Sequence, residues 1–200
     1  MNLPNFKYFY NNKAKTLDVV LHGGSQGIDS PFILKLISAC RDKGNSVLAL
    51  NFPYLDRGEK NSSGPDLKEE LSALKDVMVF CKADSFNNVR FVAKSLGAIV
   101  ASFFLRELPK ENQLKYSIVV LGYVVRSIDL KCFKGKISII QGEKDKFGGI
   151  EIVKNDMESA VSGRVSFFQI EGADHSYRKP ETKEPIYEDR VIEIFSSLAN

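Results

Sequence analysis

Ser95 stands where an apolar run of strand length, residues 89–92, gives way to a segment with helical period. A sharp turn from strand to helix exposes a serine as a nucleophile. Such a turn requires small residues two positions before and after the serine, because the neighbouring backbones come close. Ala93 and Gly97 meet this requirement, with Ala93 in the place where the motif G-x-S-x-G has glycine. A serine at a helix start is also a common N-cap, so other residues must distinguish the two interpretations.

A nucleophilic serine needs a general base, and the sequence contains two histidines, His22 and His175. His175 lies after the last predicted strand and before the last predicted helix, which places it at the same edge of the sheet as Ser95. We therefore predict that His175 is the base. His22 follows the first predicted strand, and we interpret it as a structural residue that packs under the next loop.

A carboxylate is the third residue of such a triad, because it orients the imidazole and stabilises its charged form. The loop after the next-to-last predicted strand contains Asp145, which we predict for this role. Glu143 in the same loop and Asp174, the neighbour of His175 in sequence, remain alternatives.

Two backbone N–H groups are needed to hold the oxyanion that forms during acyl transfer. Leu96 follows the serine and supplies one of them. The sequence His-Gly-Gly at 22–24 supplies the other, with Gly24 as the first choice and Ser25 as the second. This glycine-rich loop could instead cradle a phosphate, but neither G-x-G-x-x-G nor G-x-x-x-x-G-K-[ST] is present, and Asn51 stands where a ribose-binding acid is expected.

The elements that position these residues follow from hydrophobic periodicity. Apolar runs of strand length occur at about 17–21, 46–50, 89–92, 117–121, 137–140 and 165–170. Most are continuous rather than alternating, which is typical of parallel strands covered on both faces. Segments with helical period lie between them, at about 31–43, 65–81, 96–108 and 150–160 and from 185 onward.

Alternation of strand and helix predicts an α/β fold, a three-layer α/β/α sandwich around a mainly parallel sheet, with ligands at the carboxyl ends of the strands. No linker divides residues 1–200, so we expect one domain. The segment between the predicted strands at 123 and 136 is too short for a lid domain, which predicts an open, shallow site. Ser25, Tyr54 and Tyr123 are predicted to line it.

Composition narrows the class of partner. Lys and Arg number 28 against 25 Asp and Glu, and the net charge of +3 is too small and too dispersed to predict a nucleic-acid or membrane partner. Cys40, Cys81 and Cys132 lie far apart among apolar neighbours, which is typical of reduced, packed thiols. With neither a signal peptide nor an apolar run of spanning length, we expect a cytoplasmic protein. We expect no cofactor and no metal.

Four groups of residues resemble a known family: 22–24 with 30–32, 51–54, 94–97, and 141–148 with 172–175. They are similar to those of small, lidless α/β-hydrolase-like proteins often labelled predicted dienelactone hydrolases. That family is related to the hydrolase-like domain of a chromatin-complex subunit and to a testis-expressed protein. The resemblance covers about residues 17–198 and implies the α/β-hydrolase fold, in which serine, acid and histidine follow one another in the order of Ser95, Asp145 and His175. Dienelactone hydrolases themselves use a cysteine where this chain has Ser95, so the label predicts no substrate.

These residues together predict a serine hydrolase that cleaves a small carboxylic ester or thioester through an acyl-enzyme. Its partner is then a small-molecule acyl substrate, and the oligomeric state is left open. The alternative is a non-catalytic binding or scaffolding protein with the same fold, because fold alone does not imply function and members of the resembling family are thought to act as interaction modules. A nucleotide-binding domain is disfavoured by the missing phosphate motifs.

Overall fold

A seven-stranded sheet in the order β1-β3-β2-β4-β5-β6-β7 forms the centre of the computed structural model, which describes residues 3–199. The strands are β1 (Phe6–Phe9), β2 (Thr16–Leu21), β3 (Ser46–Leu50), β4 (Asn88–Lys94), β5 (Tyr116–Leu121), β6 (Lys136–Gly142) and β7 (Val165–Ile170). The edge strand β1 pairs antiparallel with β3, and all the other pairs are parallel. The predicted α/β class with a mainly parallel sheet is therefore confirmed.

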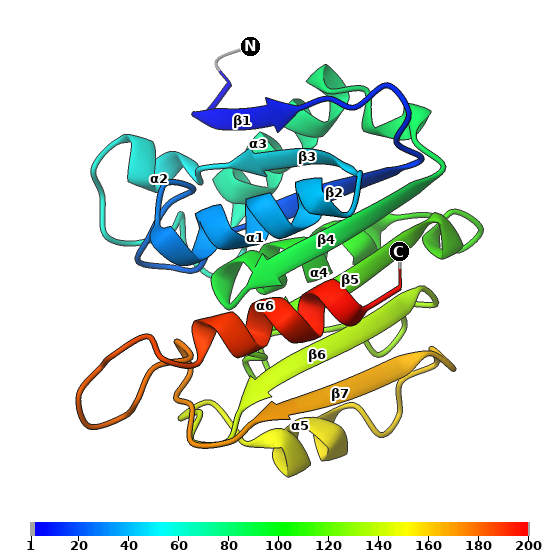
Figure 1. Ribbon diagram of the computed structural model, residues 1–200. Helices are drawn as coiled ribbons and strands as arrows, with labels where there is room; N and C mark the ends of the chain where they lie inside the picture. Colours follow the sequence, from blue (N-terminus) through cyan, green and yellow to red (C-terminus); the bar gives the residue numbers. More distant parts are fainter. Residues whose placement is uncertain (1–2, 200) are drawn as a thin grey trace.

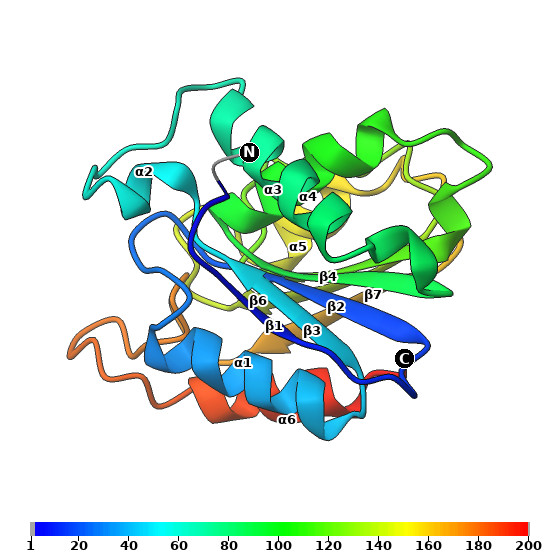
Figure 2. The same ribbon diagram turned by 90° about the horizontal axis from the view of Figure 1, so that it is seen from above.

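Helices cover both faces of this sheet (Figures 1 and 2). They are α1 (Pro31–Asp42), α2 (Pro53–Asp56), α3 (Lys68–Phe80), α4 (Leu96–Glu107), α5 (Ile150–Asp156) and α6 (Glu188–Ser197), with short 3-10 turns at Ala83–Ser85 and Gln113–Lys115. Figure 2 shows α1 and α6 on one face of the sheet and α3, α4 and α5 on the other. The β5–β6 connection, residues 122–135, contains no helix, in agreement with the predicted absence of a lid.

The two helical layers follow from the alternation of side chains along each buried strand. All six residues of β2 are buried. Leu17, Val19 and Leu21 pack in the cluster that contains residues of α3 and α4, whereas Val20 packs in the cluster that contains residues of α1 and α6. A strand that is covered on both faces has apolar residues at consecutive positions, which is why its sequence reads as a continuous run.

Some boundaries differ from the predicted ones. The helix expected to begin at Pro65 begins at Lys68, because Leu67 has a left-handed backbone (φ 48°) that no helix continues through. The helix expected at 150–160 ends at Asp156. Strand β1 was not predicted, since it has only four residues, all half-buried. The thiols of Cys40 and Cys81 are buried as expected, but Cys132 is exposed, so its prediction as a packed thiol is wrong.

Within residues 3–199, no helix combines the length and the apolar character needed to cross a membrane.

Candidate active site

Ser95 lies in the sharp turn that joins β4 to α4. Its backbone angles, φ 49° and ψ −111°, are outside the regions that residues other than glycine normally occupy. Such a conformation persists only where the surroundings enforce it, and here the Ser95 N–H donates to the Leu121 carbonyl on the neighbouring strand at 3.0 Å. The turn holds the serine side chain clear of both elements that it connects, as a nucleophile requires.

The small residues that flank Ser95 face β2. Ala93 pairs with Leu21 in the sheet and is fully buried. Gly97 lies even closer to the same strand: a Cβ on it would be 2.7 Å from the carbonyl oxygen of His22 and 2.8 Å from that of Leu21. The requirement for a small residue is therefore strict at Gly97, whereas a methyl group is accommodated at Ala93.

His175 connects Ser95 to Asp145 through two hydrogen bonds. Its Nε2 lies 2.8 Å from the Ser95 hydroxyl, and its Nδ1 lies 2.7 Å from the Asp145 carboxylate. A carboxylate only accepts hydrogen bonds, so Nδ1 carries the ring proton and Nε2 is free to accept the serine proton. The three residues predicted as a triad thus touch in series, although they come from three distant segments of the chain.

Glycines at the ends of β5 and β6 allow the His175 loop to approach. Gly122 has φ 74°, and a Cβ on it would lie 2.9 Å from the His175 ring. A Cβ on Gly142 would lie 2.5 Å from the carbonyl oxygen of Ala173 and 2.6 Å from that of Asp174. Any larger residue at either position would push the imidazole away from the serine.

Asp145 is held by donors other than His175. The Phe147 N–H donates to its Oδ1 at 2.8 Å, and the Gln141 side-chain amide donates to its Oδ2 at 2.9 Å. Gln141 is fully buried and also bonds backbone groups of Tyr123 and Gly148. The sequence analysis gave Gln141 no role, although a polar residue that ends a buried apolar strand is a signal for one.

The alternative acids have other partners. Glu143 accepts from the Gly172 N–H at 2.8 Å, and this bond, followed by its contact with Lys144, lowers the pKa of Glu143. Asp174 caps the turn that follows His175, accepting from the Ser176 and Arg178 N–H groups. Burial alone would raise the pKa of Asp174, but these bonds and Lys183 outweigh burial and lower it. Of the three carboxylates, Asp145 is the one bonded to the imidazole.

The glycine-rich loop after β2 lies beside the serine. An added Cβ on Gly23 would be 3.7 Å from the Ser95 Cβ, and Gly24 and Ser25 border the same cavity. Leu96 is the first residue of α4, so its N–H has no acceptor within the helix. The oxyanion hole at Gly24, or Ser25, and Leu96 stays a prediction.

His22 supports that loop from beneath, as predicted. It is fully buried, its Nε2 accepts from the Phe52 N–H at 3.0 Å, and its Nδ1 contacts the Gly23 carbonyl at 2.6 Å. Because Nε2 must accept, the proton is on Nδ1, which donates to Gly23. Burial lowers the pKa of His22 and keeps the ring neutral.

Tyr54 and Tyr123 do not line the site, and their prediction as substrate contacts is wrong. Both side chains are fully buried. The Tyr54 hydroxyl donates to the Gly24 carbonyl at 2.8 Å, so this residue holds the glycine-rich loop. The Tyr123 hydroxyl bonds Ile128, within the β5–β6 connection, and Asp156, at the end of α5. A position after a strand end does not determine which way a large side chain turns.

Two residues without a predicted role lie beside the imidazole. The Phe147 ring contacts the His175 ring edge to face, with 4.6 Å between centroids, and is 39% exposed. The Lys94 ammonium donates to the His175 carbonyl at 3.1 Å and lies over the Tyr177 ring. Burial lowers the pKa of Lys94 to about 8, against the opposing effect of the Asp145 and Asp174 carboxylates.

A cavity of about 160 Å³ opens beside the serine. It is bordered by the glycine-rich loop, the start of α1, the turn at Ser95, the His175 loop and the start of α6. Its side chains include Lys94, Arg178 and Glu188. Among residues 3–199, no group of three or more His, Cys, Asp or Glu is arranged to hold a metal ion.

Comparison with solved structures identifies the fold. An alpha-beta serine hydrolase homologue from Coxiella burnetii has a TM-score of 0.76 at 16% identity, over 97% of this chain and 91% of that one. A serine hydrolase without lid from Xanthomonas campestris has a TM-score of 0.67 at 15% identity, over 99% and 88%. Est1E from Butyrivibrio proteoclasticus, with ferulic acid bound, has a TM-score of 0.68 at 12% identity, over 96% and 92%. At these identities the likeness establishes the α/β-hydrolase fold.

The sequence gives the family directly. The family model described as alpha/beta hydrolase domain matches residues 14–200, so the chain belongs to that family. A search of curated proteins finds no match.

Proposed function

We propose that this protein is a serine hydrolase that cleaves a small carboxylic ester or thioester through an acyl-enzyme. The observation that carries the proposal is the unbroken series of hydrogen bonds from the Ser95 hydroxyl through His175 to Asp145. Both bonds are within the range at which a proton is transferred between side chains. The strained turn at Ser95 further supports the proposal, because such strain is concentrated at functional sites.

In the proposed mechanism, the Ser95 oxygen attacks the acyl carbon while its proton passes to His175 Nε2. The N–H groups of Leu96 and Gly24 hold the negative charge that develops on the carbonyl oxygen, with Ser25 as the alternative second donor. Collapse of the tetrahedral intermediate expels the alcohol or thiol, which takes the proton from His175. Water then attacks the acyl-enzyme and gives a proton to His175, and His175 returns this proton to the Ser95 oxygen as the second tetrahedral intermediate collapses and the acid leaves.

Asp145 acts on His175 throughout this cycle. Its carboxylate keeps the ring proton on Nδ1 and stabilises the imidazolium that forms when Ser95 is deprotonated. Gln141 and the Phe147 N–H in turn hold the carboxylate in place. We place Gln141 in the mechanism as a positioning residue, since it contacts neither the serine nor the imidazole.

The surroundings of Ser95 favour a small, partly polar acyl group. The cavity beside it has about 160 Å³ of space and is lined by Ser30, Lys94 and Arg178 as well as by Phe32 and Ile33. The exposed Phe147 ring on the other side of the imidazole offers an apolar surface to a leaving group. Because the Phe147 side is open to solvent, we expect the size of the leaving group to vary more among substrates than the size of the acyl group.

Hydrolysis of matched substrates tests the proposal. Purified protein is assayed with p-nitrophenyl acetate, butyrate and octanoate and with the corresponding acyl thioesters. We expect kcat/KM to fall as the acyl chain lengthens, and to fall by roughly 10³-fold or more in Ser95→Ala and Asp145→Asn. Glu143→Gln is the matched control, because it changes a carboxylate in the same loop that does not contact His175.

A non-catalytic binding protein of this fold is the alternative. It would give no turnover with any of these substrates, and Ser95→Ala would then behave as the wild type does. Hydrolysis that survives in Ser95→Ala would also count against the proposed mechanism.

A further inference from the structure

A second pocket lies at the opposite edge of the sheet from Ser95. It is bordered by residues that begin strands, among them Asn88 of β4, Tyr116 of β5 and Lys136 of β6. Ser95 follows the carboxyl end of β4, six to seven residues further along the chain. At about 3.3 Å per residue the two sites are on the order of 20 Å apart. A molecule in this pocket therefore does not contact the proposed catalytic residues.

The pocket arises because a helix ends before the strands that it covers. Arg90 pairs with Ser117 in the β4–β5 register, and Ser117 pairs with Lys136 in the β5–β6 register. In parallel strands, residues in register point to the same face, which here is the face covered by α1 and α6. Helix α6 ends at Ser197, so these polar side chains border a cavity of about 110 Å³ rather than a helix surface.

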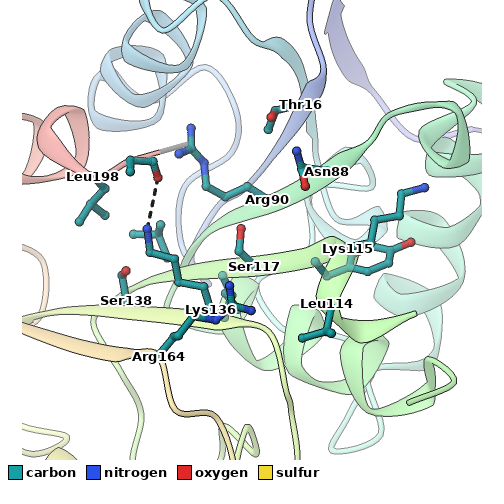
Figure 3. A pocket seen from close by; sticks show the side chains of 14 residues that line it. Thr16, Asn88, Arg90, Leu114, Lys115, Ser117, Lys136, Ser138, Arg164 and Leu198 are labelled. Carbon is teal, nitrogen blue, oxygen red and sulfur yellow. Dashed lines mark hydrogen bonds between the residues drawn. The ribbon is translucent and has the colours of Figure 1, made fainter. Parts of the chain in front are cut away.

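Figure 3 shows this pocket, with the side chains of Arg90, Ser117, Ser138 and Lys136 gathered beside Leu198. The Lys136 ammonium donates to the Ala199 carbonyl at 3.4 Å.

The charge of the pocket is strongly one-sided. Of the described lining residues, four are basic and none is acidic. The basic residues are Arg90, Lys115, Lys136 and Arg164. Asp18 behind the pocket neutralises Arg90 alone, through bonds of 2.7 Å to Nε and 2.9 Å to Nη2. Burial lowers the pKa of the neighbouring Lys43, and Arg90 and Lys136 lower it further, against Asp18 and Cys40.

One donor in the pocket lacks a partner. Arg90 Nη1 is buried and makes no hydrogen bond, and it is the one such side-chain atom found among residues 3–199. Ser117 and Ser138 add hydroxyl groups to the lining, and Ser138 is only 2% exposed. A buried guanidinium N–H without an acceptor costs more than a neutral group would. An anion in the pocket would stabilise this guanidinium through its charge.

We propose that this pocket binds a tetrahedral oxyanion, either inorganic phosphate or the phosphate group of a small phosphomonoester. Its donors come from three adjacent strands and from the chain that precedes β7, so they surround one volume rather than form a plane. A planar carboxylate presents only two oxygens, in one plane, so it would leave some of these donors without an acceptor. The Arg90 fork binds Asp18 and Lys115 bonds the Asp84 carbonyl, which leaves two hydroxyls and the Lys136 and Arg164 cations for an anion with several oxygens.

Nuclear magnetic resonance titration of the full chain tests this site. Sodium phosphate, glycerol 3-phosphate and sodium acetate are added separately at constant ionic strength, with chloride as the counter-anion. The chain carries no tag at its carboxyl end, because Leu198 and Ala199 line the pocket. We expect saturable amide shifts at 88–90, 115–118 and 136–138 with both phosphates, and much weaker ones with acetate. Tighter binding of glycerol 3-phosphate identifies a phosphomonoester as the ligand, and equal or tighter binding of phosphate identifies the free ion.

Two sets of variants separate a built site from a general charge effect. The double variant Lys136→Gln and Arg164→Gln removes two lining charges, and Ser117→Ala removes one hydroxyl without changing charge. We expect about tenfold or more weaker binding in the double variant and a smaller but measurable loss in Ser117→Ala. Lys134→Gln with Lys179→Gln is the charge-matched control, since both lysines are exposed and lie outside the lining. The proposal is overturned if the amide shifts saturate with neither phosphate nor glycerol 3-phosphate. It is also overturned if the control variant weakens binding as much as the double variant does.

Discussion

Replacement of Gly97 by alanine tests whether the turn at Ser95 depends on close contact with β2. In a helix, Gly→Ala normally stabilises by about 1 kcal/mol. Here the added Cβ would lie 2.7 Å from the His22 carbonyl oxygen, 2.7 Å from the Leu21 Cβ and 2.8 Å from the Leu21 carbonyl oxygen. Two of these atoms are backbone oxygens, at the last residue of β2 and the residue after it, and cannot rotate away. Overpacking costs roughly 1–3 kcal/mol, and contact with fixed backbone atoms puts this case in the upper part of that range, at about 2–3 kcal/mol.

The contacts therefore outweigh the helix preference, and we expect Gly97→Ala to be less stable by about 1–2 kcal/mol. For a chain of this size, that change lowers the melting temperature by roughly 2–8 °C. The turn must also move away from the loop that carries Gly24, which separates the two proposed oxyanion donors. A displacement of this order reduces kcat by roughly tenfold to a hundredfold.

Thermal unfolding followed by circular dichroism, together with ester hydrolysis, measures both effects. Gly163→Ala is the control, because its Cβ meets nothing within 4 Å and its φ is not positive. We expect that variant to be neutral or slightly more stable than the wild type, by less than about 1 kcal/mol. If Gly97→Ala melts at or above the wild-type temperature with unchanged activity, the account of the turn is wrong.

Three further predictions concern residues around the site. Gln141→Met removes a donor to Asp145, so kcat should fall by roughly tenfold to a hundredfold with little change in KM. A change in KM with kcat unaltered would refute a positioning role. The pKa of His22 in the folded protein is below its unfolded value of 6.5, so the unfolded chain gains the proton first as pH falls. The free energy of unfolding of the wild type, measured relative to that of His22→Gln, should therefore decrease as pH falls below about 6.5. Lys94 has a folded pKa of about 8 against 10.5 unfolded, so wild type should gain stability relative to Lys94→Met as pH rises from 8 to 10 in urea titrations; a constant difference would contradict burial of the ammonium.

The sheet and the three central residues of the site could be predicted because local patterns encode them. Continuous apolar runs indicate parallel strands that are covered on both faces, and the carboxyl ends of such strands lie at one edge. Ser95, Asp145 and His175 each follow a predicted strand, so their convergence follows from the topology. The need for a small residue at position 97 could also be predicted, because it depends on a turn formed by neighbouring residues in the sequence.

Features that depend on tertiary contacts could not be predicted. The directions of the Tyr54 and Tyr123 side chains are set by carbonyl groups far away in sequence, at Gly24 and Ile128. Gln141 in β6 bonds Asp145 only four residues further along the chain, yet its role depends on the direction in which its side chain points from the strand. The basic pocket is likewise invisible in sequence, because its residues come from separate strands and become neighbours only through the strand register.

Reaction with a fluorophosphonate probe tests the central claim most directly, since such a probe requires a serine activated by its own base. Intact-mass analysis should show one adduct per chain, peptide mapping should place it on Ser95, Ser95→Ala should remain unmodified, and His175→Gln should react far more slowly. A folded wild-type protein that stays unmodified, or an adduct that persists in Ser95→Ala, would contradict the account.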